Sequence, residues 1–243
     1  MKKNTPIKEI KKDFPVRINK YLADKGFSTR RGGDELIKKG LVYINGKIAV
    51  LGDSVNEHDI VTIPKPKKSS YTYYLYHKPV GIVTVGRGPG EKEIKDVTKL
   101  PEGVFPIGRL DKDSHGLIIL TNDGRVTDRL LNPKYDHEKE YRVILDKPVT
   151  HEFMIRLRNG VSLGKNFKTK KADVRRFNSH TIDIVITEGK NRQVRRMCAS
   201  FNYAVEDLCR IRIMNLELEK LGSNSLKKLT GETLQIFLKS IGL

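Results

Sequence analysis

The chain has 243 residues, and its 47 lysine and arginine residues against 29 aspartate and glutamate residues give a net charge of +18. This surplus argues against an ordinary enzyme of small metabolites and indicates a polyanionic partner, with nucleic acid favoured over an anionic membrane. No apolar stretch approaches the ~18 residues of a membrane-spanning helix. The first residues also lack the apolar segment of a signal peptide, so we expect a cytoplasmic protein.

Cysteine and histidine residues are few and widely spaced. Cys198 and Cys209 are eleven positions apart, and the six histidines are scattered without the paired spacing of metal ligands. The two thiols suit a reducing compartment, and they suggest neither a zinc site nor a disulfide framework. We therefore expect no structural metal.

The N-terminal part of the chain predicts a basic tail and a small domain. Residues 1–13 are rich in lysine and poor in apolar groups, which is typical of a mobile tail. In residues 14–63 the apolar positions predict two short amphipathic helices. Residues 41–47 predict a strand followed by an Asn-Gly turn, and further strand is predicted at Val55 and at residues 60–63. The order helix, helix, hairpin fits one small domain.

Five basic side chains cluster around these elements: Arg17, Lys20, Arg30, Arg31 and Lys47. Such a cluster alone is more often a solvated face than a binding site. However, the segments RINKYL, STRR and VYINGK that carry it resemble, in this order, the αL-type (S-four-like) RNA-binding domain, which implies that these side chains bind RNA. The sequence departs from that domain at Gly32 and Gly33. Since each glycine weakens a helix by about 1 kcal/mol relative to alanine, the second helix is expected to start late.

Residues 64–70 (PKPKKSS) predict a basic linker stiffened by proline, which places the second domain at residues 71–243. Residues 1–70 hold 16 basic and 8 acidic side chains, and the rest of the chain holds 31 and 21. Both parts are therefore expected to contact the polyanion. The second domain begins with a predicted strand and a turn, which contains the segment KPVG at residues 78–81.

The segment most suggestive of chemistry is GRLDKDSHGLIILTNDG at residues 108–124. Within it, residues 117–120 predict a buried strand between turn residues. A carboxylate directly before a rigid strand is held firmly, which makes Asp111 the candidate for the reacting group. A calcium loop is disfavoured, because its fifth and twelfth positions are His115 and Asn122. A catalytic carboxylate pair with Asp113 and a turn with solvated charges remain open on the residues alone.

Regular elements continue through the rest of the chain. Residues 125–131 predict a short helix, residues 137–145 predict a strand that contains Tyr141, and residues 172–177 and 181–187 predict a strand pair. Taken alone, a strand tyrosine is usually a core residue.

Two further helices are predicted on polar and apolar spacing. Thr150 is a candidate N-cap for a helix that runs to residues 159–160. The basic segment 188–198, taken as a helix, places Arg192, Arg195 and Arg196 to the side of a buried stripe that contains Val194, Met197, Cys198 and Phe201.

Four motifs, in this order, resemble the RsuA/RluB/RluE/RluF branch of the RNA pseudouridine synthases. They are KPVG, the segment at residues 108–124, a Lys-x-Tyr-x-Val pattern at residues 139–143, and GKNRQVRRM at residues 189–197. The resemblance covers roughly residues 14–238, and residues 210–214 most resemble the RluF type. It implies an α+β fold, in which the αL-type domain is followed by a synthase domain on a mixed, mostly antiparallel sheet.

The resemblance implies isomerisation of uridine to pseudouridine in structured RNA, a reaction that demands no metal and no cofactor. Asp111 corresponds to the family's essential catalytic residue, Tyr141 to the tyrosine that packs on the target base, and Arg195 to the arginine that pairs with the catalytic aspartate. Further contacts to the RNA or the target nucleotide are expected from Arg109, Arg192, Val194 and Arg196.

The resemblance favours large-subunit (23S) ribosomal RNA as the substrate of a monomeric enzyme. Small-subunit (16S) ribosomal RNA, as for RsuA, and transfer RNA are alternatives within the class. A non-catalytic RNA-binding or ribosome-assembly protein is the alternative outside it, and the presence of Asp111, Tyr141 and Arg195 disfavours that alternative. Whether Asp111 attacks the base or the sugar, or acts as a base in a glycal route, stays open.

Overall fold

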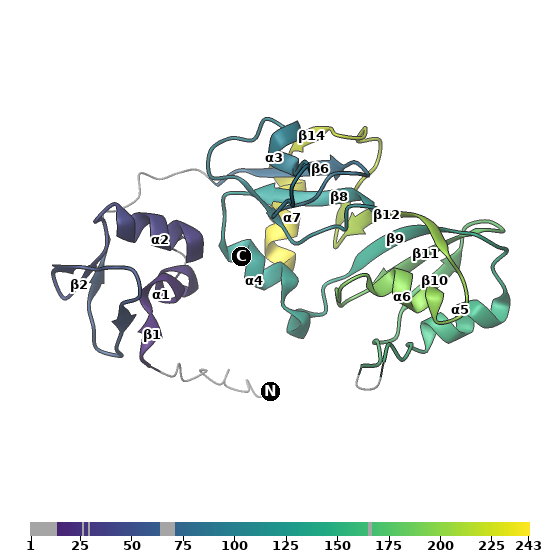
Figure 1. Cartoon of the computed structure of the whole chain (residues 1–243), viewed down its shortest axis with the longest axis horizontal. Helices are drawn as coiled ribbons and strands as arrows, with labels where there is room; N and C mark the ends of the chain where they lie inside the picture. The colour runs from purple at the N-terminus through teal and green to yellow at the C-terminus, as the bar shows by residue number, and fades with distance from the viewer. Residues whose placement is uncertain (1–13, 26, 29, 64–70, 165–166) are drawn as a thin grey trace, which may run out of the picture. The chain divides into compact units, whose positions relative to one another are not determined.

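The structure is a computed structural model that describes residues 14–25, 27, 28, 30–63, 71–164 and 167–243. The contacts divide the chain into two compact units, residues 1–70 and 71–243, and each is described by itself (Figure 1). The expected tail at residues 1–13 and linker at residues 64–70 lie outside the described residues. None of the helices in the described ranges is long and apolar enough to cross a membrane.

The first unit combines two helices with short strands, as the sequence predicted. Its elements are β1 (Val16–Arg17), α1 (Ile18–Asp24), α2 (Arg30–Lys38), β2 (Tyr43–Ile44), β3 (Lys47–Ile48), β4 (Ser54–Val55) and β5 (Val61–Thr62). β1 pairs with β4, and β2 lies between β3 and β5. The predicted turn joins β2 to β3, and its residues Asn45 and Gly46 have φ values of 50° and 80°, the conformation that Asn-Gly favours in hairpins.

The prediction that the second helix starts late is wrong. α2 begins at Arg30 and contains both Gly32 and Gly33. A Cβ atom on Gly33 would lie 3.4 Å from Cα of Asn19 and 3.3 Å from Oγ of Ser28. The missing side chain therefore allows α1 and α2 to approach closely, and this packing outweighs the low helix propensity of glycine.

The second unit is built on a nine-stranded sheet. Its strands are β6 (Tyr73–Lys78), β7 (Phe105–Ile107), β8 (His115–Thr121), β9 (Lys139–Leu145), β10 (Asp173–Arg176), β11 (Thr181–Ile186), β12 (Val205–Ile213), β13 (Leu216–Glu217) and β14 (Leu226–Lys228). The main path has the order β10-β11-β9-β12-β8-β6-β14, with β13 beside β12 and β7 beside β8. Among these strands β12 and β8 pair in parallel and the other pairs are antiparallel, so the predicted mixed, mostly antiparallel sheet is confirmed.

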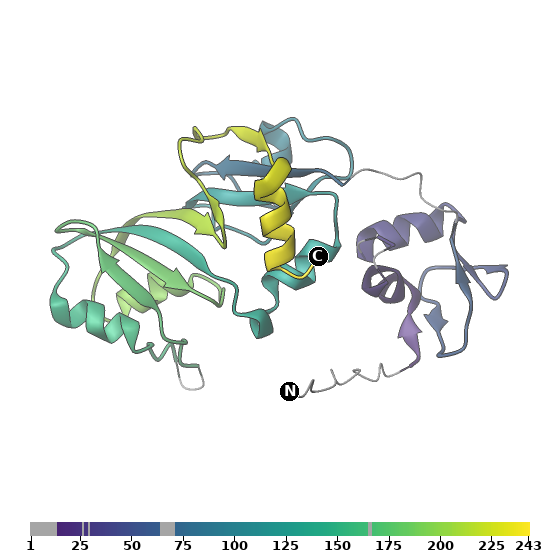
Figure 2. The same cartoon turned by 180° about the vertical axis from the view of Figure 1, so that it is seen from behind.

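Helices pack on both faces of this sheet. They are α3 (Ile94–Val97), α4 (Arg125–Leu131), η1 (Pro133–Tyr135), α5 (His151–Arg158), α6 (Gln193–Ala199) and α7 (Gly231–Ser240). α5 and α6 form one apolar cluster with β9, β10 and β11. α4 and α7 form another cluster with β6, β8 and β12. α6 lies in front of the sheet in Figure 1, whereas α7 lies in front of it when the unit is seen from behind in Figure 2.

Local sequence signals explain several helix ends. The hydroxyl of Thr150 accepts a hydrogen bond from the N–H of Phe153 (3.1 Å), so it caps α5 as predicted. The helix predicted within residues 188–198 begins only at Gln193, because Arg192 has a positive φ of 48°. The predicted buried stripe nevertheless forms on the helix and just beyond it, from Val194, Met197, Cys198 and Phe201.

Candidate active site

Four residues in register form a row across the centre of the sheet. Lys78 of β6 pairs with Gly116 of β8, Gly116 pairs with Arg210 of β12, and Arg210 pairs with Tyr141 of β9. Residues in register on neighbouring strands point to the same face of a sheet. This is the face that carries α6, because Tyr141 belongs to the α5–α6 cluster. The row therefore places two cations and a tyrosine on this face of the sheet.

Only glycine fits at position 116, because the backbone of β12 lies too close for a side chain. Its φ is +112°, and a Cβ atom there would lie 2.4 Å from the carbonyl oxygen and 2.5 Å from the nitrogen of Arg210. Any side chain would push β12 away from β8. The glycine of the segment GRLDKDSHG is thus needed for the close parallel pairing beside the candidate reacting group.

The loop between β7 and β8 holds Asp111 on a fixed backbone. The hydroxyl of Thr84 donates a hydrogen bond to the carbonyl of Leu110 (2.8 Å) and accepts one from its N–H (3.0 Å). On the other side, the N–H of Ser114 donates to the carbonyl of Asp111 (3.1 Å). Asp111 itself is half-buried, and the ion pairs of this loop within the described residues go to its neighbours Lys112 and Asp113. A carboxylate without an ion-pair partner on a fixed backbone suits a reacting group.

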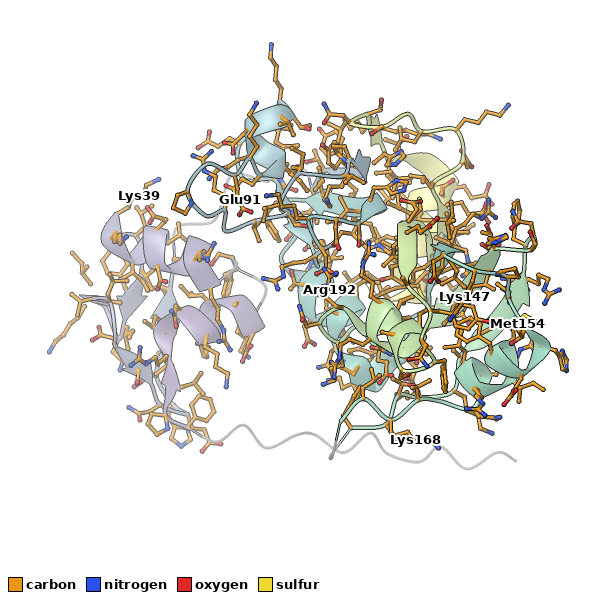
Figure 3. The ribbon with its side chains drawn as sticks, turned by 45° about the vertical axis from the view of Figure 1, so that its right-hand side comes forward. Lys39, Glu91, Lys147, Met154, Lys168 and Arg192 are labelled. Carbon is orange, nitrogen blue, oxygen red and sulfur yellow. The ribbon has the colours of Figure 1, made fainter. Side chains whose placement is uncertain are left out.

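Asp113, two residues further on, is the carboxylate that two arginines hold. Arg192, labelled in Figure 3 directly before α6, donates hydrogen bonds to both carboxylate oxygens, at 2.9 and 2.7 Å. Nε of Arg195 lies 3.4 Å from Oδ2 of the same carboxylate. The hydrogen bonds from Arg192 and the charges of both arginines hold the pKa of Asp113 below its usual value. Asp113 therefore stays ionised and anchors the loop to α6.

Arg195 also fixes the backbone of this loop. Its side chain is only 12% exposed. Nη2 donates to the carbonyl of Asp113 (2.8 Å), and Nη1 donates to the carbonyl of Val205 (2.9 Å) at the start of β12. The family resemblance implied a pairing with Asp111, whereas the structure places the guanidinium on Asp113. Arg195 thus ties the loop of Asp111 to the sheet.

The apolar residues implied by the motifs lie in one cluster. Tyr141 is 8% exposed and belongs to the same buried cluster as Val194 of α6 and Leu110, the residue that precedes Asp111. The structure therefore brings together the Asp111 loop, Tyr141 and Val194 from three separate parts of the chain. Burial of Tyr141 in this cluster also agrees with the plainer interpretation of a core tyrosine.

The sequence analysis missed a group of buried cations. Lys78 is fully buried, and Lys139 and Arg210 are 9% and 4% exposed. Burial lowers the pKa of Lys78 to about 8, although the charge of Asp111 opposes this effect. Burial lowers the pKa of Lys139 to about 8 as well, and the nearby charge of Arg210 contributes. Positive charge is thus concentrated in the interior of the second unit, where burial makes it costly, and the charge of Lys78 interacts with Asp111.

Backbone carbonyls hold these cations in place. The ammonium of Lys78 donates to the carbonyl of Ile82 (2.6 Å), and Nε of Arg210 donates to the carbonyl of Leu117 (2.7 Å). Nη2 of Arg210 is buried and has no hydrogen-bond partner in the described part of the chain. One signal was available in the sequence, since an arginine within the apolar run of a central strand is unusual.

The other predicted contact residues are exposed. Arg109 lies on the surface next to the Asp111 loop in the sequence, and Arg196 donates to the carbonyl of Leu163 (2.7 Å). In the first unit the exposed side chains include all five predicted cations, Arg17, Lys20, Arg30, Arg31 and Lys47.

Family models and sequence relatives agree with this geometry. A model for RNA pseudouridylate synthase matches residues 72–200, and a model for the S4 domain matches residues 16–61. The dual-specificity RNA pseudouridine synthase RluF of Escherichia coli (strain K12) is 40% identical over 227 residues, which span 91% of this chain and 78% of the relative. Ribosomal large subunit pseudouridine synthase B of Bacillus subtilis (strain 168) is 34% identical over 225 residues, 88% of this chain and 92% of the relative.

A solved structure shares the fold. It is described as a crystal structure of pseudouridylate synthase, and it superposes with a TM-score of 0.69 at 27% sequence identity. The match covers 93% of this chain and 99% of the solved one.

Proposed function

From the premise that this chain belongs to the RNA pseudouridine synthase family, we propose that Asp111 is the carboxylate that reacts with a target uridine in large-subunit ribosomal RNA. The enzyme isomerises uridine to pseudouridine in RNA. The reaction breaks the bond between ribose and N1 of uracil and forms a bond to C5 without net oxidation. It therefore requires a carboxylate that attacks or abstracts a proton, and a means of holding the base.

The observation that carries the proposal is the state of Asp111. Its backbone is hydrogen-bonded on both sides, while the two arginines of the site are engaged by Asp113. The buried ammonium of Lys78 lies close enough to interact electrostatically with Asp111. Of the two carboxylates in the loop, Asp111 is therefore the one that is positioned and still available to react.

Tyr141 and Arg195 have different proposed roles. The target base leaves its stack in the RNA, at a cost of a few kcal/mol, and packs against Tyr141 with Val194 as an apolar floor. Arg195 is a positioning residue, because its contacts go to the backbone of the Asp111 loop and to Asp113. Arg192 orders the same loop through Asp113, and Arg109 and Arg196 contact the RNA backbone.

The first unit supplies much of the RNA affinity. An RNA-binding domain of this type with five exposed cations supports contacts to a structured RNA. The name of the Bacillus subtilis relative, a ribosomal large subunit pseudouridine synthase, supports ribosomal RNA of the large subunit as the target. We infer that the enzyme acts in the cytoplasm as a monomer.

Mapping pseudouridines in ribosomal and transfer RNA from cells with and without this protein tests the proposed target. We expect the loss of pseudouridine from large-subunit RNA, and restoration by the wild-type protein but not by an equally expressed Asp111→Ala variant. Loss from small-subunit or transfer RNA alone would contradict the proposed target. Restoration by the variant would contradict the role of Asp111.

A further inference from the structure

Three side chains that can bind a metal ion, and a carboxylate beside them, meet on the face of the sheet opposite the candidate active site. They are His77 of β6, His115 of β8, and Asp207 and Cys209 of β12. Along each strand they alternate with the residues that form the row at the candidate active site, so they point to the other face of the sheet. One ring nitrogen of each histidine and Sγ of Cys209 all lie within 4.8 Å of one another. Two of the six scattered histidines are thus brought together with a cysteine by the register of three strands.

The hydrogen bonds of the two histidines leave two nitrogen lone pairs facing each other. Nδ1 of His77 lies 2.8 Å from the carbonyl oxygen of Leu221, and Nε2 of His115 lies 3.0 Å from a carboxylate oxygen of Asp207. A carbonyl and an ionised carboxylate only accept hydrogen bonds, so both of these outer nitrogens must carry the proton. In neutral rings the inner nitrogens, Nε2 of His77 and Nδ1 of His115, are then both acceptors, although they are only 3.1 Å apart. Such a contact between two acceptors is repulsive unless a cation lies between or beside the two nitrogens.

The arrangement matches what a protein provides to a transition metal. Histidine ligands usually donate their second N–H to a carboxylate or a backbone carbonyl, which fixes the tautomer, and here one histidine has each kind of partner. Two nitrogens on one tetrahedral Zn²⁺ are about 3.3 Å apart, and a nitrogen and a thiolate sulfur about 3.5 Å apart. The observed nitrogen separation of 3.1 Å is close to the first value. The sulfur lies within 4.8 Å of a nitrogen of each histidine, so it needs to move by at most about 1.3 Å, which side-chain rotation can supply.

We propose that His77, His115 and Cys209 form a binding site for a divalent metal ion of the Zn²⁺ type, with Asp207 and the Leu221 carbonyl orienting the two imidazoles. Mixed imidazole and thiolate ligands favour Zn²⁺ and similar borderline ions. Binding requires inner nitrogens without a proton, and it displaces the proton of the thiol, which passes to solvent. The side chains of His115 and Asp207 are 23% and 37% exposed, so the ion reaches the site from solvent. A fourth position remains for water.

The site is placed to influence the loop of Asp111. His115 directly follows Ser114, whose backbone N–H holds the carbonyl of Asp111. Cys209 directly precedes Arg210, a member of the row at the candidate active site. An ion on one face would therefore cross-link β6, β8 and β12 at the level where the other face carries the candidate active site.

Cobalt titration of the purified full-length protein, stripped of metal by a chelator, tests the site without any measurement of RNA modification. Co²⁺ in a tetrahedral site with a thiolate ligand gives a thiolate-to-metal charge-transfer band in the near ultraviolet and intense visible bands. We expect one Co²⁺ per chain, displaced by one equivalent of Zn²⁺. Asp207→Asn should weaken binding about 10- to 100-fold, because it removes the partner of His115 and leaves the ligands in place.

The two cysteines supply a matched pair of variants. Cys209→Ala should abolish the charge-transfer band, whereas Cys198→Ala removes the other buried thiol and should leave it unchanged. Circular dichroism checks that both variants are folded, and His115→Gln serves in place of Cys209→Ala if that variant unfolds. Absence of a saturable band in the wild-type protein would overturn the proposal. A band that survives both Cys209→Ala and His115→Gln would also overturn it.

Discussion

The two units of this protein use positive charge in opposite ways. In the first unit the five predicted cations are all exposed. In the second unit Lys78, Lys139 and Arg210 are buried, and Arg195 is 12% exposed and engaged with Asp113 and backbone carbonyls. Exposed charges attract a polyanion from a distance and are screened by salt, whereas buried charges are screened much less and are held in one geometry. Under the proposed function the exposed cations therefore contribute affinity for RNA, whereas the buried cations of the second unit organise the reaction site.

Among the cations, the largest effect is expected from Arg195. Arg195→Met removes the contacts from α6 to the carbonyls of Asp113 and Val205 and frees the loop of Asp111. Since a misplacement of 1 Å can cost about 100-fold in rate, we expect the single-turnover rate at saturating RNA to fall by this factor or more. The neighbour Arg196, which is exposed, is the matched control, and Arg196→Met should mainly raise the dissociation constant. Equal losses in the saturated rate would show that Arg195 does not position the loop.

Removal of the whole first unit should separate affinity from chemistry. Deletion of residues 1–63 eliminates the five exposed cations, and each lost phosphate contact lowers the slope of log affinity against log salt by about 0.7 to 0.9. We expect weaker RNA binding with a flatter salt dependence, and a saturated single-turnover rate close to that of the full chain. Filter binding at several salt concentrations measures the RNA affinity and its salt dependence. Unchanged affinity would mean that the first unit serves another partner.

The burial of Lys78 should be detectable in the pH dependence of the free energy of unfolding. Burial lowers the pKa of Lys78 from 10.5 to about 8, so the unfolded chain binds more protons between these values. The contribution of Lys78 to the free energy of unfolding should therefore rise with pH through this window, by up to on the order of 3 kcal/mol for a shift of this size. Lys139 and the buried thiols of Cys198 and Cys209 also titrate abnormally in the folded protein, and they do so in the wild type and the variants alike. Denaturant unfolding at several pH values should therefore show a free energy of unfolding that rises with pH in the wild type relative to Lys78→Met. Lys228→Met changes an exposed lysine and should follow the wild type.

The smallest effect is expected from single exposed cations of the first unit. Lys47→Gln or Arg30→Gln should leave the saturated rate unchanged and reduce the salt slope by about 0.7 to 0.9. The same equilibrium binding measurement detects this change. A lower single-turnover rate at saturating RNA from either substitution would contradict the assignment of these cations to affinity alone.

Much of this organisation was predictable from the sequence, because the motifs lie at positions where local signals are strong. The apolar run at residues 117–120 predicted β8, the Asn-Gly turn predicted the hairpin, and Thr150 predicted the start of α5. Asp111 was selected because a polar segment precedes that buried strand. These features depend on residues close together in the chain.

Features that depend on long-range register were not predictable. Arg210 reaches the site because β12 pairs in parallel with β8, and no local sequence pattern predicts this pairing. His77, His115 and Cys209 meet for the same reason. The helix of Gly32 and Gly33 was mispredicted because its stability comes from packing on α1, which propensity does not contain. Arg195 was expected to pair with Asp111 and lies on Asp113, because the fold of the loop determines which of the two carboxylates faces the guanidinium.

The central claim is that the two carboxylates of the loop have different roles, with Asp111 reacting and Asp113 anchoring the arginines. Release of tritium from uridine labelled at C5, in a single turnover at saturating RNA, measures this directly. We predict no release above background with Asp111→Asn, and slower but complete release with Asp113→Asn, because Arg195 keeps its contacts to the two backbone carbonyls. Release by Asp111→Asn, or complete inactivity of a folded Asp113→Asn variant with full RNA affinity, would contradict the account.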